Sequence, residues 1–161
     1  MKKTLLTFGI AAIVVLAVIA GVFYIQRGAH LELQGKILKV RTAPIDDKSS
    51  VAVVDFRFTN VADYEFDVRK VTVMLVDSSG AQTEGSTISE IDAERLFQGI
   101  PLLGQKYNPS LITRNKIPPH ATQDRMIAAR FEVPEDRLDH RRQLVVRIEE
   151  VDGAVSELRE K

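Results

Sequence analysis

The feature that most constrains this chain is an uncharged apolar run near its N-terminus. Residues 5–25 (LLTFGIAAIVVLAVIAGVFYI) provide 21 consecutive positions without a charged side chain. The hydrocarbon core of a bilayer is about 30 Å thick, and a helix needs roughly 20 apolar residues to cross it. The run therefore predicts a single transmembrane helix. It divides the chain into an N-terminal membrane anchor, residues 1–27, and an exported domain, residues 28–161.

A cleaved signal peptide is the alternative interpretation, with a small-residue cleavage site after Ala20. Signal peptides usually carry an apolar region of about 7–15 residues, whereas here the apolar character continues to Ile25. The length therefore favours an uncleaved anchor. Lys2 and Lys3 resist transfer across the membrane, while a long domain is translocated largely regardless of its charge. We expect the N-terminus in the cytoplasm and residues 26–161 on the opposite side.

The overall composition excludes several classes of protein. Lys and Arg number 22, Asp and Glu also number 22, and there is no Cys. A near-neutral balance gives no electrostatic footprint for nucleic acid. The lack of Cys excludes disulfides, thiolate zinc sites, iron–sulfur clusters and a Cys nucleophile. Because the chain also lacks a P-loop, a G-x-S-x-G motif and a G-x-G-x-x-G motif, we expect a non-enzymatic protein without a cofactor.

Alternating apolar residues predict a mainly β domain. In residues 50–60, Ala52, Val54, Phe56 and Phe58 share one face, which we expect to be buried. Residues 65–77 follow the same pattern if a bulge at Arg69-Lys70 shifts the register by one residue. Further strands are predicted over residues 31–42, 81–88, 122–133, 143–151 and 154–158.

Six or seven strands separated by turn signals favour an antiparallel two-sheet sandwich with one short helix. Ser89 and Asp92 resemble a capping box at the start of that helix, and Gly99 is a plausible stop. The mixed-charge stretch 135–142 is interpreted as a polar turn between two strands. The expected core contains Phe56, Phe58, Val73, Leu75 and Phe131.

Two stretches resemble a known class of domain. In residues 53–85, a strand that ends in Asn60 precedes one that finishes in Leu75 and Asp77 before a turn at Gly80. In residues 117–134, a Pro-rich turn leads into a strand that ends in Phe131 and Val133. This pattern is similar to immunoglobulin-like modules of bacterial envelope proteins, of the FxLYD type and of the late embryogenesis abundant, water-stress type. The resemblance implies an immunoglobulin-like β-sandwich with an adhesive role, held at the bacterial inner membrane, with the domain periplasmic or extracellular.

Ionisable side chains show no spacing that predicts a catalytic or metal centre. His30, His120 and His140 are isolated in the sequence, and solvated loop positions explain them best. Carboxylates at Asp46, Asp47 and Asp77 offer at most a weak cation site. A periplasmic solute- or cation-binding domain is therefore the alternative function.

The segment 100–112 (IPLLGQKYNPSLI) is unusually apolar for a loop that contains prolines and a glycine. Two interpretations remain open: these residues cover an open end of the sandwich as part of the core, or they form an exposed patch for a partner. The combination of a Tyr with adjacent leucines is typical of an interface centre. We expect a membrane-tethered accessory subunit or assembly factor that contacts a protein partner through Leu102, Leu103, Tyr107 and Leu111.

Overall fold

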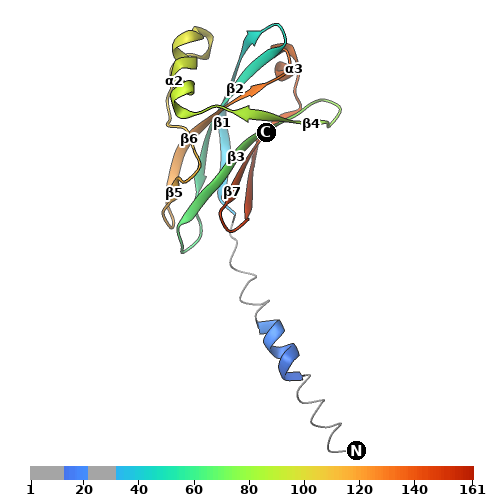
Figure 1. Cartoon of the computed structure of the whole chain (residues 1–161), viewed down its shortest axis with the longest axis vertical. Coiled ribbons are helices and arrows are strands. Elements are labelled where there is room, and N and C mark those ends of the chain that lie inside the picture. Colours follow the sequence, from blue (N-terminus) through green and yellow to red (C-terminus); the bar gives the residue numbers. More distant parts are fainter. Residues whose placement is uncertain (1–12, 22–31) are drawn as a thin grey trace, which may run out of the picture. The chain divides into compact units, whose positions relative to one another are not determined.

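The computed structural model describes residues 13–21 and 32–161, and the chain divides into two units, residues 1–31 and 32–161. Residues 13–21 form a helix (Figure 1). Its side chains are exposed. The rest of the predicted membrane segment 5–25 lies outside the described residues. Within the described ranges, no helix has the length and apolar character that crossing a bilayer requires. The membrane anchor therefore stays a prediction.

Residues 32–161 fold into one curled antiparallel sheet, so the expectation of a mainly β, antiparallel domain is confirmed (Figure 1). The strands run in the order β1-β2-β6-β4-β3-β7-β8, with β5 paired to β3. Their bounds are β1 Gln34–Asp46, β2 Ser49–Thr59, β3 Phe66–Val76, β4 Gln82–Thr87, β5 Lys116–Ile117, β6 Thr122–Phe131, β7 Gln143–Glu150 and β8 Val155–Arg159. The predicted bulge is confirmed as a register shift between Val68 and Lys70.

Strand β4 lies between β3 and β6 and pairs with each of them along a different part of its length. It pairs with β3 up to Gly85, and then with β6 through Ser86 and Thr87. Gly85 is required at this corner, since a Cβ there would lie 2.6 Å from the ring of Phe131. At the other side of the sheet, Leu33 N donates to Ser156 Oγ at 2.8 Å, which draws the start of β1 towards β8.

The main core fills the inner face of the curled sheet. The predicted members Phe56, Phe58, Val73, Leu75 and Phe131 are all buried, so this part of the prediction is confirmed. The alternating pattern of β2 therefore predicted correctly that the face with Phe56 and Phe58 is buried. Strand β1 continues to Asp46, beyond the predicted end at residue 42, and passes through Pro44. A proline is tolerated there because β1 is an edge strand.

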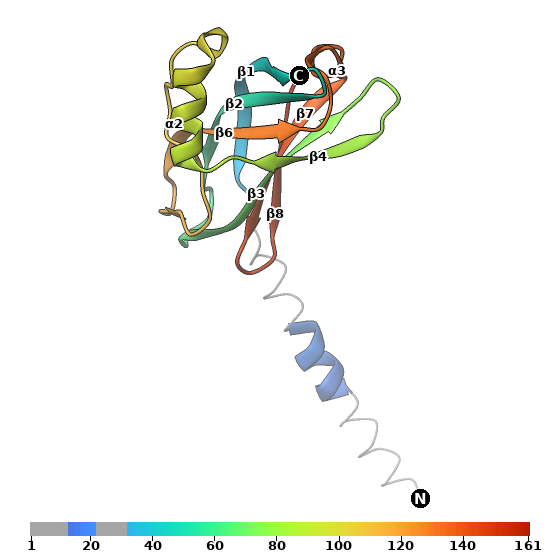
Figure 2. The same ribbon diagram turned by 45° about the horizontal axis from the view of Figure 1, so that its top comes forward.

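A second apolar cluster covers the outer face of β1, β2 and β6. Helix α2 (Glu90–Gly99) lies beside β6 (Figure 2), and it is followed by the short 3-10 helix η1 (Pro101–Leu103). Ala93 of α2 and Leu103 of η1 belong to one buried cluster with Val51, Val53 and Met126. Strand β2 is therefore buried on both faces along most of its length. The predicted start of α2 is confirmed, because the Ser89 hydroxyl accepts a hydrogen bond from Asp92 N at 3.2 Å.

The stretch 135–142 is not the polar turn that its charges indicated, because it contains helix α3 (Glu135–Asp139). One apolar residue, Leu138, explains the difference, since the helical turn buries it completely in the main core. The charged neighbours find partners around it: Thr42 Oγ1 donates to Asp139 Oδ1 at 2.8 Å, and Arg141 binds both carboxylate oxygens of Glu160 at 2.8 and 2.6 Å.

Candidate functional site

Residues 88–113, which we call the cover, run from the end of β4 across the outer face of β1, β2 and β6. Backbone hydrogen bonds hold both ends of the cover to β6. Ile88 N donates to Ala128 O at 2.9 Å, and Leu111 N donates to Met126 O at 2.8 Å. Just beyond the cover, Arg114 N donates to Val68 O of β3 at 2.7 Å. The segment is therefore tied to the sheet along its path.

A buried ion pair fixes the middle of the cover. Arg41 Nη2 of β1 lies 2.7 Å from Asp55 Oδ2 of β2, and the two side chains are only 8% and 5% exposed. The other Arg41 nitrogen, Nη1, donates to the carbonyls of Leu103 and Gln105, both at 2.7 Å. Asn108 Nδ2 donates to Asp55 Oδ1 at 3.0 Å. The ion pair thus binds the cover through its backbone and through an amide side chain.

Two aromatic rings of the cover contact the same guanidinium. The Arg41 guanidinium carbon lies 5.0 Å from the centre of the Phe97 ring and 5.4 Å from that of Tyr107. Lys39 Nζ lies 5.9 Å from the Tyr107 ring. Cations over aromatic faces are attracted by the ring quadrupole, most strongly where water is excluded. Tyr107 is therefore oriented by β1 although its own side chain remains largely in solvent.

Glu90 fixes the cover at the start of α2. Its carboxylate accepts hydrogen bonds from Lys106 Nζ and from Ser110 N, the latter at 2.9 Å. Burial acts to raise the pKa of Glu90, but the hydrogen bonds from Lys106 and Ser110 outweigh it, so the pKa lies below its ordinary value. The carboxylate is therefore charged at neutral pH and joins the helix start to the far end of the cover.

The four predicted contact residues separate into two pairs. Leu103 and Leu111 are buried, whereas Leu102 is 70% and Tyr107 64% exposed. The interpretation of 100–112 as core therefore holds for the first pair only. Leu103 packs in the second cluster on the outer face of the sheet, whereas Leu111 belongs to the main core. Partner binding by any of the four stays a prediction.

Two further exposed apolar residues of the cover were missed from the sequence: Ile91 is 64% and Ile112 44% exposed. For Ile91 a signal exists, because its helical neighbours Glu94 and Arg95 place it on the polar face of α2. In residues 32–161, seven large apolar side chains are exposed, and four of them belong to the cover. Exposed apolar area is thus concentrated in this one segment.

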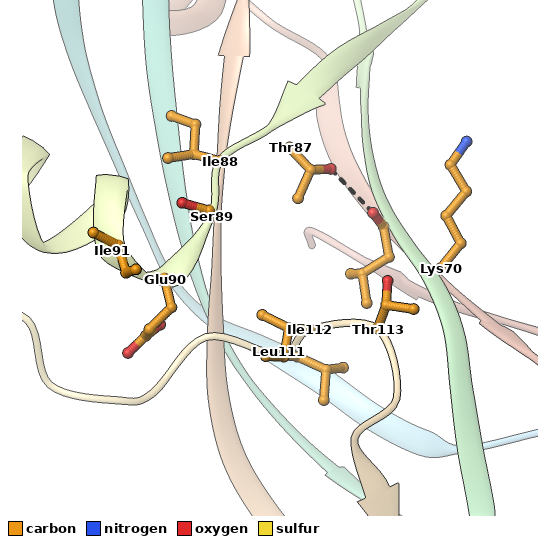
Figure 3. A pocket seen from close by; sticks show the side chains of 10 residues that line it. Lys70, Thr87, Ile88, Ser89, Glu90, Ile91, Leu111, Ile112 and Thr113 are labelled. Atoms are coloured by element: carbon orange, nitrogen blue, oxygen red, sulfur yellow. Dashed lines mark hydrogen bonds between the residues drawn. The ribbon is translucent and has the colours of Figure 1, made fainter.

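A groove of about 550 Å³ borders the cover (Figure 3). Thr87 and Ile88 lie on one side of it, and Leu111, Ile112 and Thr113 on the other. Strand β3 forms a third wall, where Thr87 Oγ1 donates to Val71 O at 3.0 Å. Most of these walls are aliphatic, so the groove is suited to apolar groups of a ligand or partner.

Two of the three carboxylates considered for a cation site, those of Asp46 and Asp77, accept hydrogen bonds within their own turns. Asp46 accepts hydrogen bonds from Ser49 Oγ at 2.7 Å and Lys48 N at 2.8 Å, and the bond from Ser49 is the main reason that its pKa is lowered. Asp77 accepts from Ser79 Oγ at 2.6 Å, which lowers its pKa in the same way. Within residues 13–21 and 32–161, no three His, Asp or Glu side chains are grouped to hold a metal ion.

The histidines are also separate. His120 Nε2 lies 2.9 Å from Asp63 Oδ1, and His140 Nδ1 lies 2.9 Å from Asp136 O, both at exposed positions. His30 lies outside the described residues. The structure does not bring His120 and His140 together with the cover or with the acidic turns into a catalytic arrangement.

No protein-family model, curated protein or solved structure matches the chain. The resemblance to bacterial envelope modules therefore stays a prediction.

Proposed function

We propose that this chain is a non-enzymatic, membrane-tethered protein of the bacterial envelope whose domain docks on a larger protein partner through the cover. The observation that carries the proposal is the exposure of Ile91, Leu102, Tyr107 and Ile112 on a segment held in place by buried polar groups. Interface energy is typically concentrated in a few apolar and aromatic anchors. Anchors that are already ordered lose little conformational entropy on binding.

The proposal includes an immunoglobulin-like sandwich as the scaffold. The main core supports it, because this cluster takes side chains from β2 and β6 and also from β3 and β7. In such an arrangement, β4 would be the strand that crosses from one sheet to the other. The cover then lies mainly on the outer face of one sheet and adds Leu111 to the shared core.

The proposal also includes a tether formed by residues 5–25 in the inner membrane. Its support is the uncharged length of that run, which matches the thickness of a bilayer. Restricting the domain to the membrane surface raises its effective concentration near a membrane-bound partner. A small apolar surface is then sufficient for docking.

One experiment tests the tether and the surface together. Membranes from cells that express the full chain are washed with alkaline carbonate, solubilised in mild detergent and used for co-purification after cross-linking. We expect the chain to remain with the membranes, and a partner to be lost in the double variant Ile91→Ser/Leu102→Ser. These two side chains are largely exposed and outside the Arg41 network, so folding should be preserved.

The matched control is Val151→Ser, which removes a 57% exposed apolar side chain in the turn before β8. The control should keep the partner. Loss of the chain from the washed membranes would contradict the tether. An unchanged set of co-purifying proteins in the double variant would contradict docking through the cover.

A further inference from the structure

A second hollow, of about 280 Å³, is formed by residues of β3, β4, β7 and β8 and shares no lining residue with the groove beside the cover. Three arginines line it, Arg142, Arg147 and Arg159, together with one carboxylate, that of Glu157. Arg147 and Glu157 are directly paired across β7 and β8, and Arg159 follows on the same face of β8. The topology thus gathers like charges at one place on the sheet.

The single carboxylate, that of Glu157, does not form hydrogen bonds with all three guanidiniums. Glu157 Oε2 accepts a hydrogen bond from Arg159 Nη2 at 2.8 Å, whereas Arg147 Nε lies 3.4 Å from Glu157 Oε1. The same Arg147 nitrogen is buried and forms no hydrogen bond. The Arg142 side chain forms no hydrogen bond or ion pair with any residue in the described ranges. The lining therefore carries three positive charges against one negative charge.

Two arginines elsewhere in the domain are bonded much more fully. Arg57 binds both oxygens of Asp124 at 2.6 and 2.7 Å, and Arg141 binds both oxygens of Glu160. Such two-point contacts are the geometry that a guanidinium prefers with a carboxylate or a phosphate. In the hollow, Arg142 and Arg147 lack this kind of partner. The walls also include the amide side chains of Gln82 and Gln143, which add hydrogen-bonding groups.

We propose that this hollow binds a phosphate group. A phosphomonoester carries a charge of about −1.5 to −2 at neutral pH and three strong acceptor oxygens. It therefore matches both the excess of two positive charges and the three guanidiniums. A carboxylate has one charge and two oxygens, and matches the lining less well. This binding role is independent of docking through the cover.

The test is a titration of the ¹⁵N-labelled full chain, in a non-ionic detergent, with inorganic phosphate at constant ionic strength. The arginine Nε–Hε signals of Arg147 and Arg159 should shift and saturate. Arg142→Gln and Arg147→Gln should each weaken binding about tenfold, which corresponds to ~1.4 kcal/mol. Glu157→Gln should strengthen binding several-fold, since it removes the only competing negative charge of the lining.

Arg69→Gln is the matched control. It removes the same charge from an exposed side chain on β3 that does not line the hollow, and binding should be unchanged. Thermal unfolding followed by circular dichroism checks that each variant is folded. The proposal is overturned if the shifts do not saturate, if Arg69→Gln weakens binding as much as Arg147→Gln, or if acetate binds as tightly as phosphate.

Two further measurements distinguish the source of the phosphate group. Glycerol 3-phosphate represents a soluble phosphorylated solute, and nanodiscs that contain phosphatidic acid represent a lipid headgroup. If the site takes a lipid headgroup, the arginine signals will already be shifted in these discs and added phosphate will bind more weakly than in discs of phosphatidylcholine. If the site takes a soluble ligand, glycerol 3-phosphate will bind equally in both kinds of disc. Either result supports the phosphate site.

Discussion

At the scale of single residues, the ion pair of Arg41 and Asp55 lies almost out of contact with water. Burying two charges is costly, and their attraction compensates only when the remaining donors and acceptors are also bonded. The Leu103 and Gln105 carbonyls and the Asn108 amide provide most of those bonds, and among the described residues only Arg41 Nε of this pair stays buried without a hydrogen bond. The ion pair thus favours one path of the cover, in which Tyr107 contacts the guanidinium and stays exposed.

We predict that Asp55→Ala lowers the free energy of unfolding by about 3–5 kcal/mol, because Arg41 would keep a buried charge without its partner. Denaturant titration of the full chain measures the change. The matched control is Asp124→Ala, which breaks the Arg57–Asp124 pair, whose side chains are 52% and 37% exposed. The control should cost less than about 1 kcal/mol. Equal losses in the two variants would argue against a special role for the buried pair.

At the scale of elements, the start of α2 is the point where hydrogen bonds join the two ends of the cover. Ser89 caps the helix, and the adjacent Glu90 reaches Lys106 and Ser110 near the other end of the cover. A carboxylate in the first turn also interacts favourably with the helix dipole. One residue therefore stabilises the helix and positions the returning loop.

The pH dependence of the free energy of unfolding should reveal the contribution of Glu90 to stability. Folding lowers its pKa below the ordinary value of 4.5, so its contribution is present above pH 4.5 and is lost as the pH falls through the lower, folded value. Glu90→Gln should cost roughly 1.5–3 kcal/mol at neutral pH, the range for hydrogen bonds to a charged group. It should also reduce the difference between the unfolding free energies measured at about pH 7 and about pH 3.

Glu94→Gln is the control on the same helix, since the Glu94 side chain is 58% exposed and lies 3.7 Å from Lys106 Nζ. It should leave both the stability and its pH dependence nearly unchanged. If Glu94→Gln flattened the pH dependence as much as Glu90→Gln, the assignment to Glu90 would be wrong.

At the scale of the whole molecule, β2 joins the two apolar clusters. Phe56 points into the main core, while Val53 packs under the cover on the opposite face of the same strand. If β2 separated from the sheet, both clusters would lose the side chains that this strand contributes. The core and the cover are therefore expected to unfold as one cooperative unit.

We predict that Phe56→Ala lowers the free energy of unfolding by about 3–5 kcal/mol, the usual cost of emptying an aromatic position in a core. A typical domain has about 5–15 kcal/mol in total, so the yield of folded protein should fall. Hydrogen exchange followed by mass spectrometry should show that peptides of β6 and of the cover lose protection together. Leu38→Ala, at a 44% exposed position, should change stability by less than about 0.5 kcal/mol. Loss of protection in β6 alone would contradict the cooperative unit.

Features that depend on near neighbours in the chain were predictable from the sequence. The alternation in β2 placed Phe56 and Phe58 inside, the pattern of β3 required the bulge near Arg69, and Ser89 identified the start of α2. These features follow from the periods of a strand and a helix and from local capping, which act over only a few residues.

The arrangement of the cover depends on contacts between residues that are distant in the sequence. Leu102 and Leu103 are adjacent in the short 3-10 helix η1, yet one is 70% and the other 1% exposed, because a helix of three residues is too short for a repeating apolar pattern to predict its buried side. Asn108 meets Asp55 across 53 positions of sequence, and the arginines of the hollow come from separate elements. Such contacts depend on how distant strands curl towards one another. Local patterns thus predicted most of the strands, helix α2 and the inner face of the sheet, whereas helix α3, which buries Leu138 in the main core, and the burial of the outer face depend on contacts between distant segments.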